Sequence, residues 1–291
     1  MLLDTSSLFY RAFFALPASI TDSRGRQINA LHGYLDMVAR LLRERKPDEL
    51  IHCLDDDWKP AGRVAAFDGY KAARAEEPPE LTAQFEVLSQ MLEAAGMAQA
   101  WAPEWEAEDA IGTLCAQAPR RDRIDIVTGD RDLLQLVHDP VVRVLITRKG
   151  VSDLAEMDEA AVEEKYGIPP GRYADFAILR GDPSDALPGV VGVGEKTARA
   201  LVNAYPSLDE MVEDARAPKS SRKPLKGSPG LKARIVSSAD YLEAMREVVP
   251  IRTDLEVVVE SPQRDDAKLD RIANARKLTG PVRRVREALA S

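Results

Sequence analysis

The amino-acid sequence predicts an α/β protein, with a parallel-sheet core followed by a mainly helical unit. Short apolar runs alternate with amphipathic helical patterns up to about residue 166, which is typical of βαβ units. After Gly167–Pro170 the strand signals thin out and helical patterns dominate. We therefore expect a core over residues 1–170 and a helical domain over residues 171–291.

The expected strands are the short apolar runs of the first half. They cover residues 1–3, 50–54, 124–127 and 141–147. Helices are expected where apolar residues recur every three or four positions. Such patterns cover residues 31–42 and 81–92, with Gly96 as a C-cap, and later parts of residues 176–179, 197–202 and 208–212. Residues 217–230, rich in Pro, Ser, Lys and Gly, are expected to form a mobile basic loop without a packed core.

The composition is that of an ordinary soluble globular protein. The 291 residues are 45% hydrophobic and 30% charged, which excludes disordered, collagen-like and coiled-coil classes. No apolar run approaches the roughly 18 residues that a membrane span needs. The N-terminus lacks the basic region of a secretory signal, so we expect a cytoplasmic protein with no membrane partner. Cys53 and Cys115 are too few for a disulfide framework or a zinc site.

The distribution of charge is more informative than its sum. A net charge of −8 argues against a nucleic-acid partner, because phosphate neutralisation supplies much of the binding free energy. Residues 215–239 depart from this average, since they hold seven basic residues and no acid. The seven are Arg216, Lys219, Arg222, Lys223, Lys226, Lys232 and Arg234. The excess acids therefore lie elsewhere, either scattered over the surface or gathered into a site.

Acids cluster after three of the expected strands and at two other positions. The five groups are Asp4; Asp55 to Asp57; Glu106, Glu108 and Asp109; Asp130 and Asp132; and Asp182 and Asp185. A single such residue is usually a cap. Five groups brought together without matching cations would repel one another unless divalent cations neutralised them. Because the ligands are oxygens, the pattern favours Mg²⁺ or Mn²⁺, and a pair of such ions suits phosphodiester hydrolysis.

Residues 187–198 form a glycine-rich turn that leads into a helix. Backbone N–H groups at such a turn can bind a phosphate. The spacing of Gly189, Gly192 and Gly194 is neither a dinucleotide-binding fingerprint nor a P-loop. It favours a hairpin between two helices that grips a nucleic-acid backbone without reading bases. A structural turn with no ligand is the alternative.

A basic and aromatic segment follows Asp55. It contains Lys59, Arg63, Phe67, Tyr70, Lys71 and Arg74. Such a segment can hold a phosphate and stack a base, although a solvated helix face would have much the same composition. Tyr10 and Arg11, close after Asp4, are likewise candidates for nucleic-acid contact or for packing.

Taken in order, these motifs resemble those of the bacterial 5′-nuclease family. This is the flap endonuclease or 5′-3′ exonuclease module that also forms the N-terminal domain of DNA polymerase I. The resemblance extends from Leu2 to about residue 260. It rests on LDTSS and YRA within residues 3–12, EAEDAIGTL at 106–114, TGDRD at 128–132, and RGDPSD at 180–185 followed by the glycine turn.

The resemblance implies a PIN-like nuclease core, a helical arch over the active site at about residues 58–95, and a helix-hairpin-helix DNA-binding motif in the helical domain. It implies a structure-specific nuclease of DNA replication and repair that hydrolyses DNA at 5′ flaps and 5′ ends. The implied cofactors are two or more Mg²⁺ or Mn²⁺ ions, with a K⁺ ion at the hairpin. We expect a monomer that acts on 5′-flap, nicked or gapped duplex DNA in the cytoplasm, associated with the nucleoid.

The resemblance also assigns residues by position. The implied metal ligands are Asp4, Asp55, Glu106, Glu108, Asp109, Asp130, Asp132, Asp182 and Asp185. The implied catalytic residues are Arg63 and Lys71, beside the scissile phosphate or 5′ strand, and Asp130. The expected DNA contacts are Tyr10, Arg11, Arg74, Gly189, Gly192, Gly194 and Lys196.

The sequence departs from the family pattern at a few positions. Glu108 stands where the family usually has Asp, Ala186 stands where it usually has Asn, and Asp55 and Asp56 both suit the second ligand. Every expected acidic position still holds an acid, which predicts an active enzyme. The alternatives are a catalytically silent DNA-junction-binding protein and a PIN-domain ribonuclease. The chain suits either a stand-alone nuclease or a fragment of a polymerase.

Overall fold

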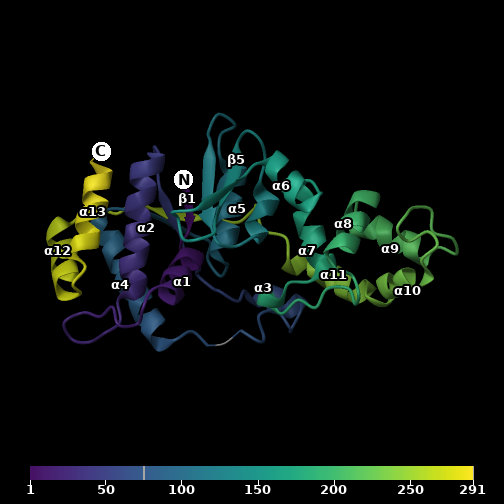
Figure 1. The fold of residues 1–291 in the computed structure, drawn as a ribbon, viewed down its shortest axis with the longest axis horizontal. Coiled ribbons are helices and arrows are strands. Elements are labelled where there is room, and N and C mark those ends of the chain that lie inside the picture. Colours follow the sequence, from purple (N-terminus) through teal and green to yellow (C-terminus); the bar gives the residue numbers. More distant parts are fainter. Residues whose placement is uncertain (75, 291) are drawn as a thin grey trace.

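The computed structural model describes residues 1–74 and 76–290. Its centre is a seven-stranded sheet in the order β6-β5-β4-β1-β2-β3-β7 (Figure 1). The five inner strands are parallel and the two edge strands are antiparallel to their neighbours, which confirms the predicted parallel core. The strands are β1 (Leu2–Asp4), β2 (Ile51–Cys53), β3 (Ala98–Trp101), β4 (Ile124–Thr128), β5 (Val142–Thr147), β6 (Leu154–Met157) and β7 (Val258–Glu260).

Two hydrophobic cores lie on the two faces of the sheet. Leu3 and Val127 belong to one core, whereas the adjacent Leu2 and Ile126 belong to the other. This alternation is that of strands buried on both faces. The first core is closed by α1 (Thr5–Ala15), α2 (Asn29–Arg45), α4 (Pro79–Ala95), α12 (Asp266–Ala275) and α13 (Thr279–Leu289).

The second core runs from the sheet into a helical unit at one end of the molecule (Figure 1). Its helices are α5 (Ala107–Gln117), α6 (Glu159–Tyr166), α7 (Tyr173–Arg180), α8 (Glu195–Ala204), α9 (Leu208–Arg216), α10 (Pro229–Ser237) and α11 (Ala239–Val248). Short 3₁₀ turns cover Asp132–Leu136, Pro170–Arg172 and Pro183–Asp185. Within the described residues, no helix has the length and apolar character that crossing a bilayer requires.

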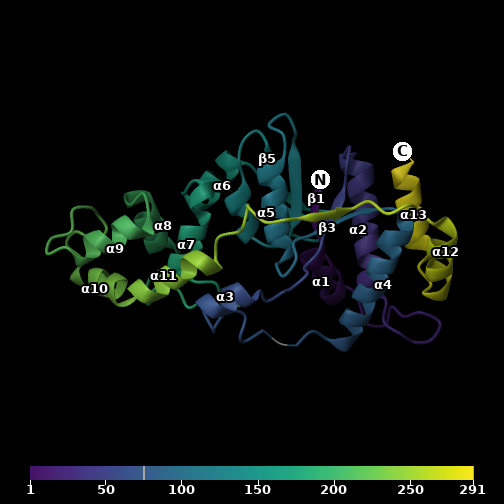
Figure 2. The same ribbon diagram turned by 180° about the vertical axis from the view of Figure 1, so that it is seen from behind.

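The chain beyond residue 257 leaves the helical unit and returns to the sheet. Figure 2 shows it running along the sheet edge to α12 and α13. There β7 pairs antiparallel with β3, and α13 packs against α2. Buried apolar residues such as Leu269 and Val285 join the core of the first half. The expected boundary at residue 170 therefore assigns α12 and α13 to a different domain from α1, α2 and α4, although all five helices pack in the first core.

The segment expected to form an arch divides into two parts. The six-residue helix α3 (Ala61–Ala66) and the turns after it span residues 61–74 and lie below the sheet in the view of Figure 2. In contrast, α4 packs against α2 and α12, and it buries Leu81, Leu88 and Met91. The expected arch of residues 58–95 thus includes one core helix.

Residues 217–228 are held in place by specific contacts, contrary to the expected mobile loop. Leu225 is only 1% exposed and belongs to the second core. The Asp214 carboxylate accepts hydrogen bonds from the Ser221 amide at 2.7 Å and the Tyr205 hydroxyl at 2.5 Å. One buried apolar residue and one satisfied acid are enough to order a loop whose composition suggests none.

The glycine turn after α7 depends on a close contact between two backbone segments. Gly181 and Gly189 have φ values of 84° and 68°. A Cβ on Gly189 would lie 2.5 Å from the Gly181 nitrogen. The Gly189 amide donates to the Tyr241 hydroxyl at 3.1 Å, and the Val190 amide donates to the Leu179 carbonyl at 3.0 Å. Gly189 is buried, so this structure gives it a packing function in place of the predicted DNA contact.

Replacing Gly189 by Ala should lower the free energy of unfolding by about 2–4 kcal/mol, because the methyl group meets backbone atoms and positive φ is unfavourable for Ala. Urea denaturation followed by circular dichroism measures the change. Gly171→Ala is the matched control, because nothing lies within 4 Å of a Cβ at that position. Equal stabilities of the two variants would show that the turn relaxes around a methyl group.

Candidate active site

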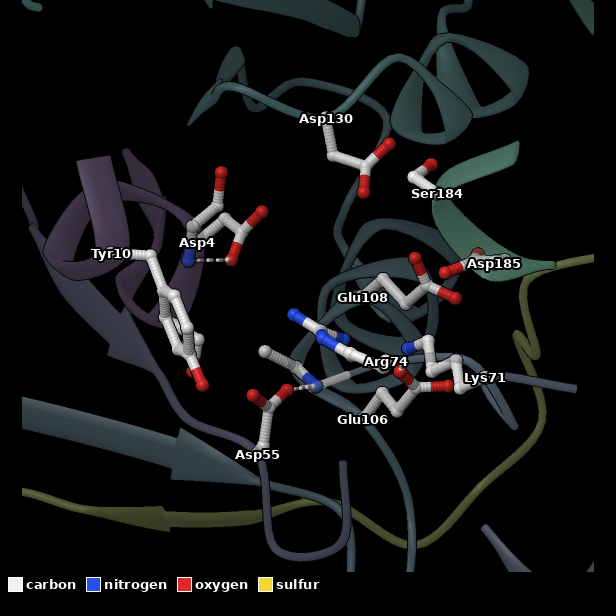
Figure 3. A pocket seen from close by; sticks show the side chains of 13 residues that line it. Asp4, Tyr10, Asp55, Lys71, Arg74, Glu106, Glu108, Asp130, Ser184 and Asp185 are labelled. Carbon is white, nitrogen blue, oxygen red and sulfur yellow. Dashed lines mark hydrogen bonds and ion pairs between the residues drawn. The ribbon is translucent and has the colours of Figure 1, made fainter. Parts of the chain in front are cut away.

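Three neighbouring strands bring acids to one edge of the sheet. Asp4 ends β1, Asp55 follows β2, and Asp130 follows β4. Because these strands are adjacent and parallel, their carboxyl ends meet at the same edge. The edge forms a cavity of about 280 Å³ (Figure 3). Its lining is Asp4, Ser6, Ser7, Tyr10, Asp55, Lys71, Arg74, Glu106, Ala107, Glu108, Asp130, Ser184 and Asp185.

The Thr128 hydroxyl connects the first and third of these acids. It donates to Asp4 Oδ2 at 2.6 Å and accepts from the Asp130 amide at 2.8 Å. Ser7 makes a parallel connection, since its amide donates to Asp4 Oδ1 at 3.2 Å and its hydroxyl accepts from the Gly129 amide at 3.0 Å. The start of α1 and the loop after β4 are therefore fixed relative to each other.

Asp55, and not Asp56, lines this cavity. One Asp55 oxygen accepts from the Ala107 amide at 2.7 Å and so anchors the first turn of α5. Asp56 accepts from the Glu104 amide at 2.7 Å and lines only the neighbouring hollow. Of the two positions that the sequence left open, Asp55 is therefore the one in the cavity.

The acids of α5 surround the Arg63 guanidinium, which is only 1% exposed. It binds Asp109 through two hydrogen bonds of 2.8 and 2.9 Å, and it lies 2.5 Å from Glu106 and 3.2 Å from Glu108. Asp109 also accepts from the Arg252 amide at 2.9 Å. Neither Arg63 nor Asp109 lines the cavity. This geometry does not support the predicted contact between Arg63 and a phosphate, because three carboxylates already surround the guanidinium.

Lys71 enters the cavity from the segment that follows α3. Its ammonium group binds Glu106 and lies 3.3 Å from the Trp58 carbonyl. The Tyr70 hydroxyl donates to the same Glu106 at 2.6 Å. The Lys71 amide donates to the Asp185 carbonyl at 3.0 Å. Lys71 therefore connects the segment that follows α3 to the start of α5 and to the 3₁₀ turn at Pro183–Asp185.

The remaining predicted ligands are distributed around Asp185. Asp185 lines the cavity, whereas Asp132 and Asp182 do not. Asp132 donates its amide to Asp130 at 2.9 Å, and Asp182 accepts from the Ser184 amide at 2.9 Å. Ala186 has a φ of 58°, in the left-handed region that Asn tolerates better than Ala. The usual Asn would thus fit the turn that positions Asp185.

The acids resist ionisation because protein surrounds them. Burial raises the pKa of Asp4 to about 7, and the hydrogen bond from Thr128 opposes this shift. Burial likewise raises the pKa of Asp185 to about 6, with Lys71 opposing it. Burial also raises the pKa of Asp55 and of Glu108. A crowded set of oxygen ligands of this kind fits a hard divalent cation such as Mg²⁺ or Mn²⁺.

Aromatic and basic side chains form one wall of the site. The Arg74 guanidinium lies 5.6 Å from the ring centres of both Tyr10 and Trp58. Tyr10 and Arg74 line the cavity, whereas Arg11 does not. A Cβ on Gly129 would lie 2.8 Å from the Arg11 guanidinium, so Arg11 covers that loop.

The other predicted DNA contacts lie in the helical unit. Gly192 and Gly194 are exposed at the hairpin, and Lys196 is exposed in the first turn of α8. The sequence reasoning assigned no function to Thr128, Ser7 or Trp58. A threonine immediately before Gly129-Asp130 at a strand end was the available signal for Thr128, whereas no pattern identified the contact of Trp58.

Comparison with known proteins identifies relatives along the whole chain. Residues 1–167 match the 5′-3′ exonuclease N-terminal resolvase-like domain, and residues 168–273 match the 5′-3′ exonuclease C-terminal SAM fold. A 5′-3′ exonuclease of Mycobacterium tuberculosis is 41% identical, over 90% of this chain and 86% of its own. A protein of the same name from Streptomyces coelicolor is 40% identical over the full length of both. DNA polymerase I of Bacillus subtilis is 34% identical, over 89% of this chain and 28% of the polymerase.

Solved structures show the same fold at low sequence identity. T5 5′-exonuclease with bound divalent metal ions (zinc) has a TM-score of 0.66 at 14% identity, over 100% of this chain and 98% of the other. The catalytic core of Rad2 in complex with DNA substrate has a TM-score of 0.62 at 17% identity, over 99% and 90%. The chain therefore belongs to the 5′-3′ exonuclease family and is a nuclease, as its motifs predicted.

Proposed function

We propose that this chain cleaves DNA phosphodiesters at 5′ flaps and 5′ ends, as a flap endonuclease and 5′-3′ exonuclease of replication and repair. One observation carries the proposal: acids from separate chain segments line a single cavity beside a cationic segment. These acids are Asp4, Asp55, Glu106, Glu108, Asp130 and Asp185. Two or more bound Mg²⁺ or Mn²⁺ ions would supply an activated water and stabilisation of the leaving oxygen.

The protein residues would hold and orient the reacting groups. Thr128 fixes the Asp4 oxygens relative to Asp130. Lys71 lies within the cavity, where its ammonium group would contact the phosphate. Tyr10 and Arg74 would hold the 5′ strand at the cavity wall. Asp109 and Arg63, buried behind the wall, would position Glu106 without touching substrate.

The substrate that suits this arrangement is a 5′-flap, nicked or gapped duplex. The exposed glycines of the hairpin would bind the duplex backbone, with a K⁺ ion as the cofactor proposed there, while the cavity receives the 5′ strand. The hairpin favours this proposal over a ribonuclease, and the intact acidic set favours it over a silent junction-binding protein. We propose that the protein acts as a monomer in the cytoplasm, associated with the nucleoid.

Asp130→Asn should reduce cleavage of an end-labelled 5′-flap duplex about 100-fold or more, because it removes a ligand oxygen from the cavity. DNA affinity should stay within a few-fold, since only one charge changes. Asp122→Asn is the matched control, because Asp122 is exposed at the opposite end of the sheet, near the start of β4. Near wild-type turnover in Asp130→Asn would place the reaction elsewhere.

Thr128→Val should raise the Mn²⁺ concentration needed for half-maximal cleavage about 10-fold, because the Asp4 oxygen loses its donor and the Asp130 amide loses its acceptor. A titration of single-turnover cleavage against Mn²⁺ measures this. Thr147→Val is a close control, since Thr147 is also a buried strand threonine and its hydroxyl has no hydrogen-bond partner among the described residues. An unchanged titration midpoint would show that Thr128 does not orient the ligands.

Binding of a divalent cation should release protons below about pH 7, because the pKa of Asp4 is raised to about 7 and that of Asp185 to about 6. The ion binds the ionised carboxylates, so the affinity should increase as pH rises through this window. In the metal-free protein these raised values act on stability in the opposite direction. The free energy of unfolding should decrease from about pH 4 to about pH 7, as the buried acids are forced to ionise.

Calorimetric titration with Mn²⁺ in two buffers of different ionisation enthalpy measures the proton release. Asp4→Asn should reduce it. Equal heats in both buffers near pH 6 would show that the acids are already ionised before the cation binds.

A further inference from the structure

Three buried polar side chains form a hydrogen-bond network behind the acidic cavity. They are Thr5 of α1, Tyr34 of α2 and His52 of β2, and each is 0% exposed. His52 Nδ1 lies 2.6 Å from the Tyr34 hydroxyl, which in turn lies 3.1 Å from the Thr5 hydroxyl. Helices α1 and α2 pack against each other beside β1 (Figure 1). The network therefore joins three elements that meet where β1 ends.

The network lies within the apolar first core. Leu3 of β1 is the register partner of His52, and the ring centre of Tyr34 lies 5.7 Å from those of both Phe9 and His52. Burial lowers the pKa of His52 to about 3, so its ring is neutral at neutral pH. Its Nε2 is shielded from solvent and has no hydrogen-bond partner among the described residues. An apolar side chain would leave no such atom unpaired, so packing alone does not account for the histidine.

The direction of the hydrogen bonds follows from the number of hydrogens available. The Thr5 hydroxyl donates to the Leu3 carbonyl at 3.4 Å. Because this uses its only hydrogen, the Thr5 oxygen accepts from Tyr34, and the Tyr34 oxygen in turn accepts from His52. This order assigns the hydrogen of the neutral His52 ring to Nδ1 and leaves Nε2 without one. His52 is therefore the donor at the start of the network, and the Leu3 carbonyl is the acceptor at its end.

The network ends on the two sides of Asp4. Leu3 precedes Asp4 and Thr5 follows it, so the hydrogen bond from Thr5 to the Leu3 carbonyl closes around the Asp4 backbone. The Asp4 carboxylate is held separately, by the Thr128 hydroxyl at 2.6 Å and the Ser7 amide at 3.2 Å. The direction in which a carboxylate points depends on its backbone as well as on its own partners. The network thus fixes the part of the Asp4 geometry that these two partners do not.

We propose that His52, acting through Tyr34 and Thr5, is a positioning residue that holds Asp4 in the orientation needed to bind a divalent cation. The inference rests on the proposed metal site and adds to it three residues that touch neither cation nor DNA. Groups that orient a ligand from behind increase metal affinity, because a preorganised carboxylate loses less freedom when the ion binds. None of the three lines the cavity, so their effect reaches the cation through Asp4.

Tyr34→Phe removes the middle of the network and retains the ring. Calorimetric titration of the full chain with Mn²⁺ alone, without DNA, should show binding about fivefold weaker than in the wild type. Tyr205→Phe is the matched control, because Tyr205 is 2% exposed and its hydroxyl donates to Asp214 in the helical unit. Its Mn²⁺ affinity should remain within twofold of the wild type. Equal losses in the two variants would overturn the proposal, as would unchanged affinity in Tyr34→Phe.

Two variants of His52 test which ring nitrogen is needed. The amide nitrogen of Asn takes nearly the place of Nδ1, so His52→Asn retains a donor to Tyr34 and loses only the unpartnered Nε2. It should keep wild-type Mn²⁺ affinity, whereas His52→Leu should weaken it about fivefold. Equal affinities in the two variants would contradict the proposal. The ¹⁵N NMR spectrum of the metal-free protein should show the His52 proton on Nδ1, and a proton on Nε2 would overturn the proposed direction.

Cleavage of a 5′-flap duplex distinguishes this inference from the proposed function. At low Mn²⁺, Tyr34→Phe should cleave about fivefold more slowly than the wild type, and saturating Mn²⁺ should restore the rate. A loss of rate that no Mn²⁺ concentration reverses would count against positioning of a metal ligand. If the wild type cleaves flaps while all variants bind Mn²⁺ equally, only the positioning network is wrong. If the wild type neither binds Mn²⁺ nor cleaves flaps, the proposed function fails together with the inference.

Discussion

Mutual repulsion among acids at one edge of the sheet is the constraint on which the rest of the site depends. Parallel strands β2, β1 and β4 deliver Asp55, Asp4 and Asp130 to the same edge, and α5 adds two glutamates. Removing these groups from water raises their pKa values, and each additional charge raises them further. The fold can keep them together if acids stay protonated or if positive charge neutralises them. Arg63 and Lys71 supply part of that charge from within the chain.

Arg63 also explains how distant segments stay in register. Its guanidinium binds Asp109 of α5 and lies 3.4 Å from the Pro250 carbonyl, while Asp109 accepts from the Arg252 amide. A Cβ on Gly112 would lie 2.5 Å from the Arg252 carbonyl, so α5 lies directly against this returning segment. Losing the Arg63 charge would leave the buried Asp109 carboxylate without its cation, at a cost of about 3–5 kcal/mol. The ion pair therefore connects α3 to α5 and to the returning segment at residues 250–252.

The sequence alone predicted the features that depend on a local pattern of residues. Apolar runs located β2, β4 and β5, and the acids after β1, β2 and β4 located one side of the cavity. It was insufficient where a tertiary contact decides the outcome: Arg63 and Gly189 were expected to touch DNA, but each is buried by a partner far along the chain. The short strands β3 and β7 gave too few residues for a pattern, and α12 and α13 join the first core only through three-dimensional packing. Leu225 ordered a loop whose composition indicated mobility.

The chain separates its charges into an acidic cavity and a basic stretch at residues 215–239. A cavity rich in acids repels a phosphate backbone until divalent cations neutralise it, so attraction to DNA has to come from elsewhere. At physiological ionic strength, exposed charges act over only about 8 Å, so the basic stretch at the far end of the helical unit (Figure 1) leaves neutralisation of these acids to Lys71, Arg63 and bound cations. The net charge of −8 therefore averages over an acidic cavity and a stretch of seven cations without an acid.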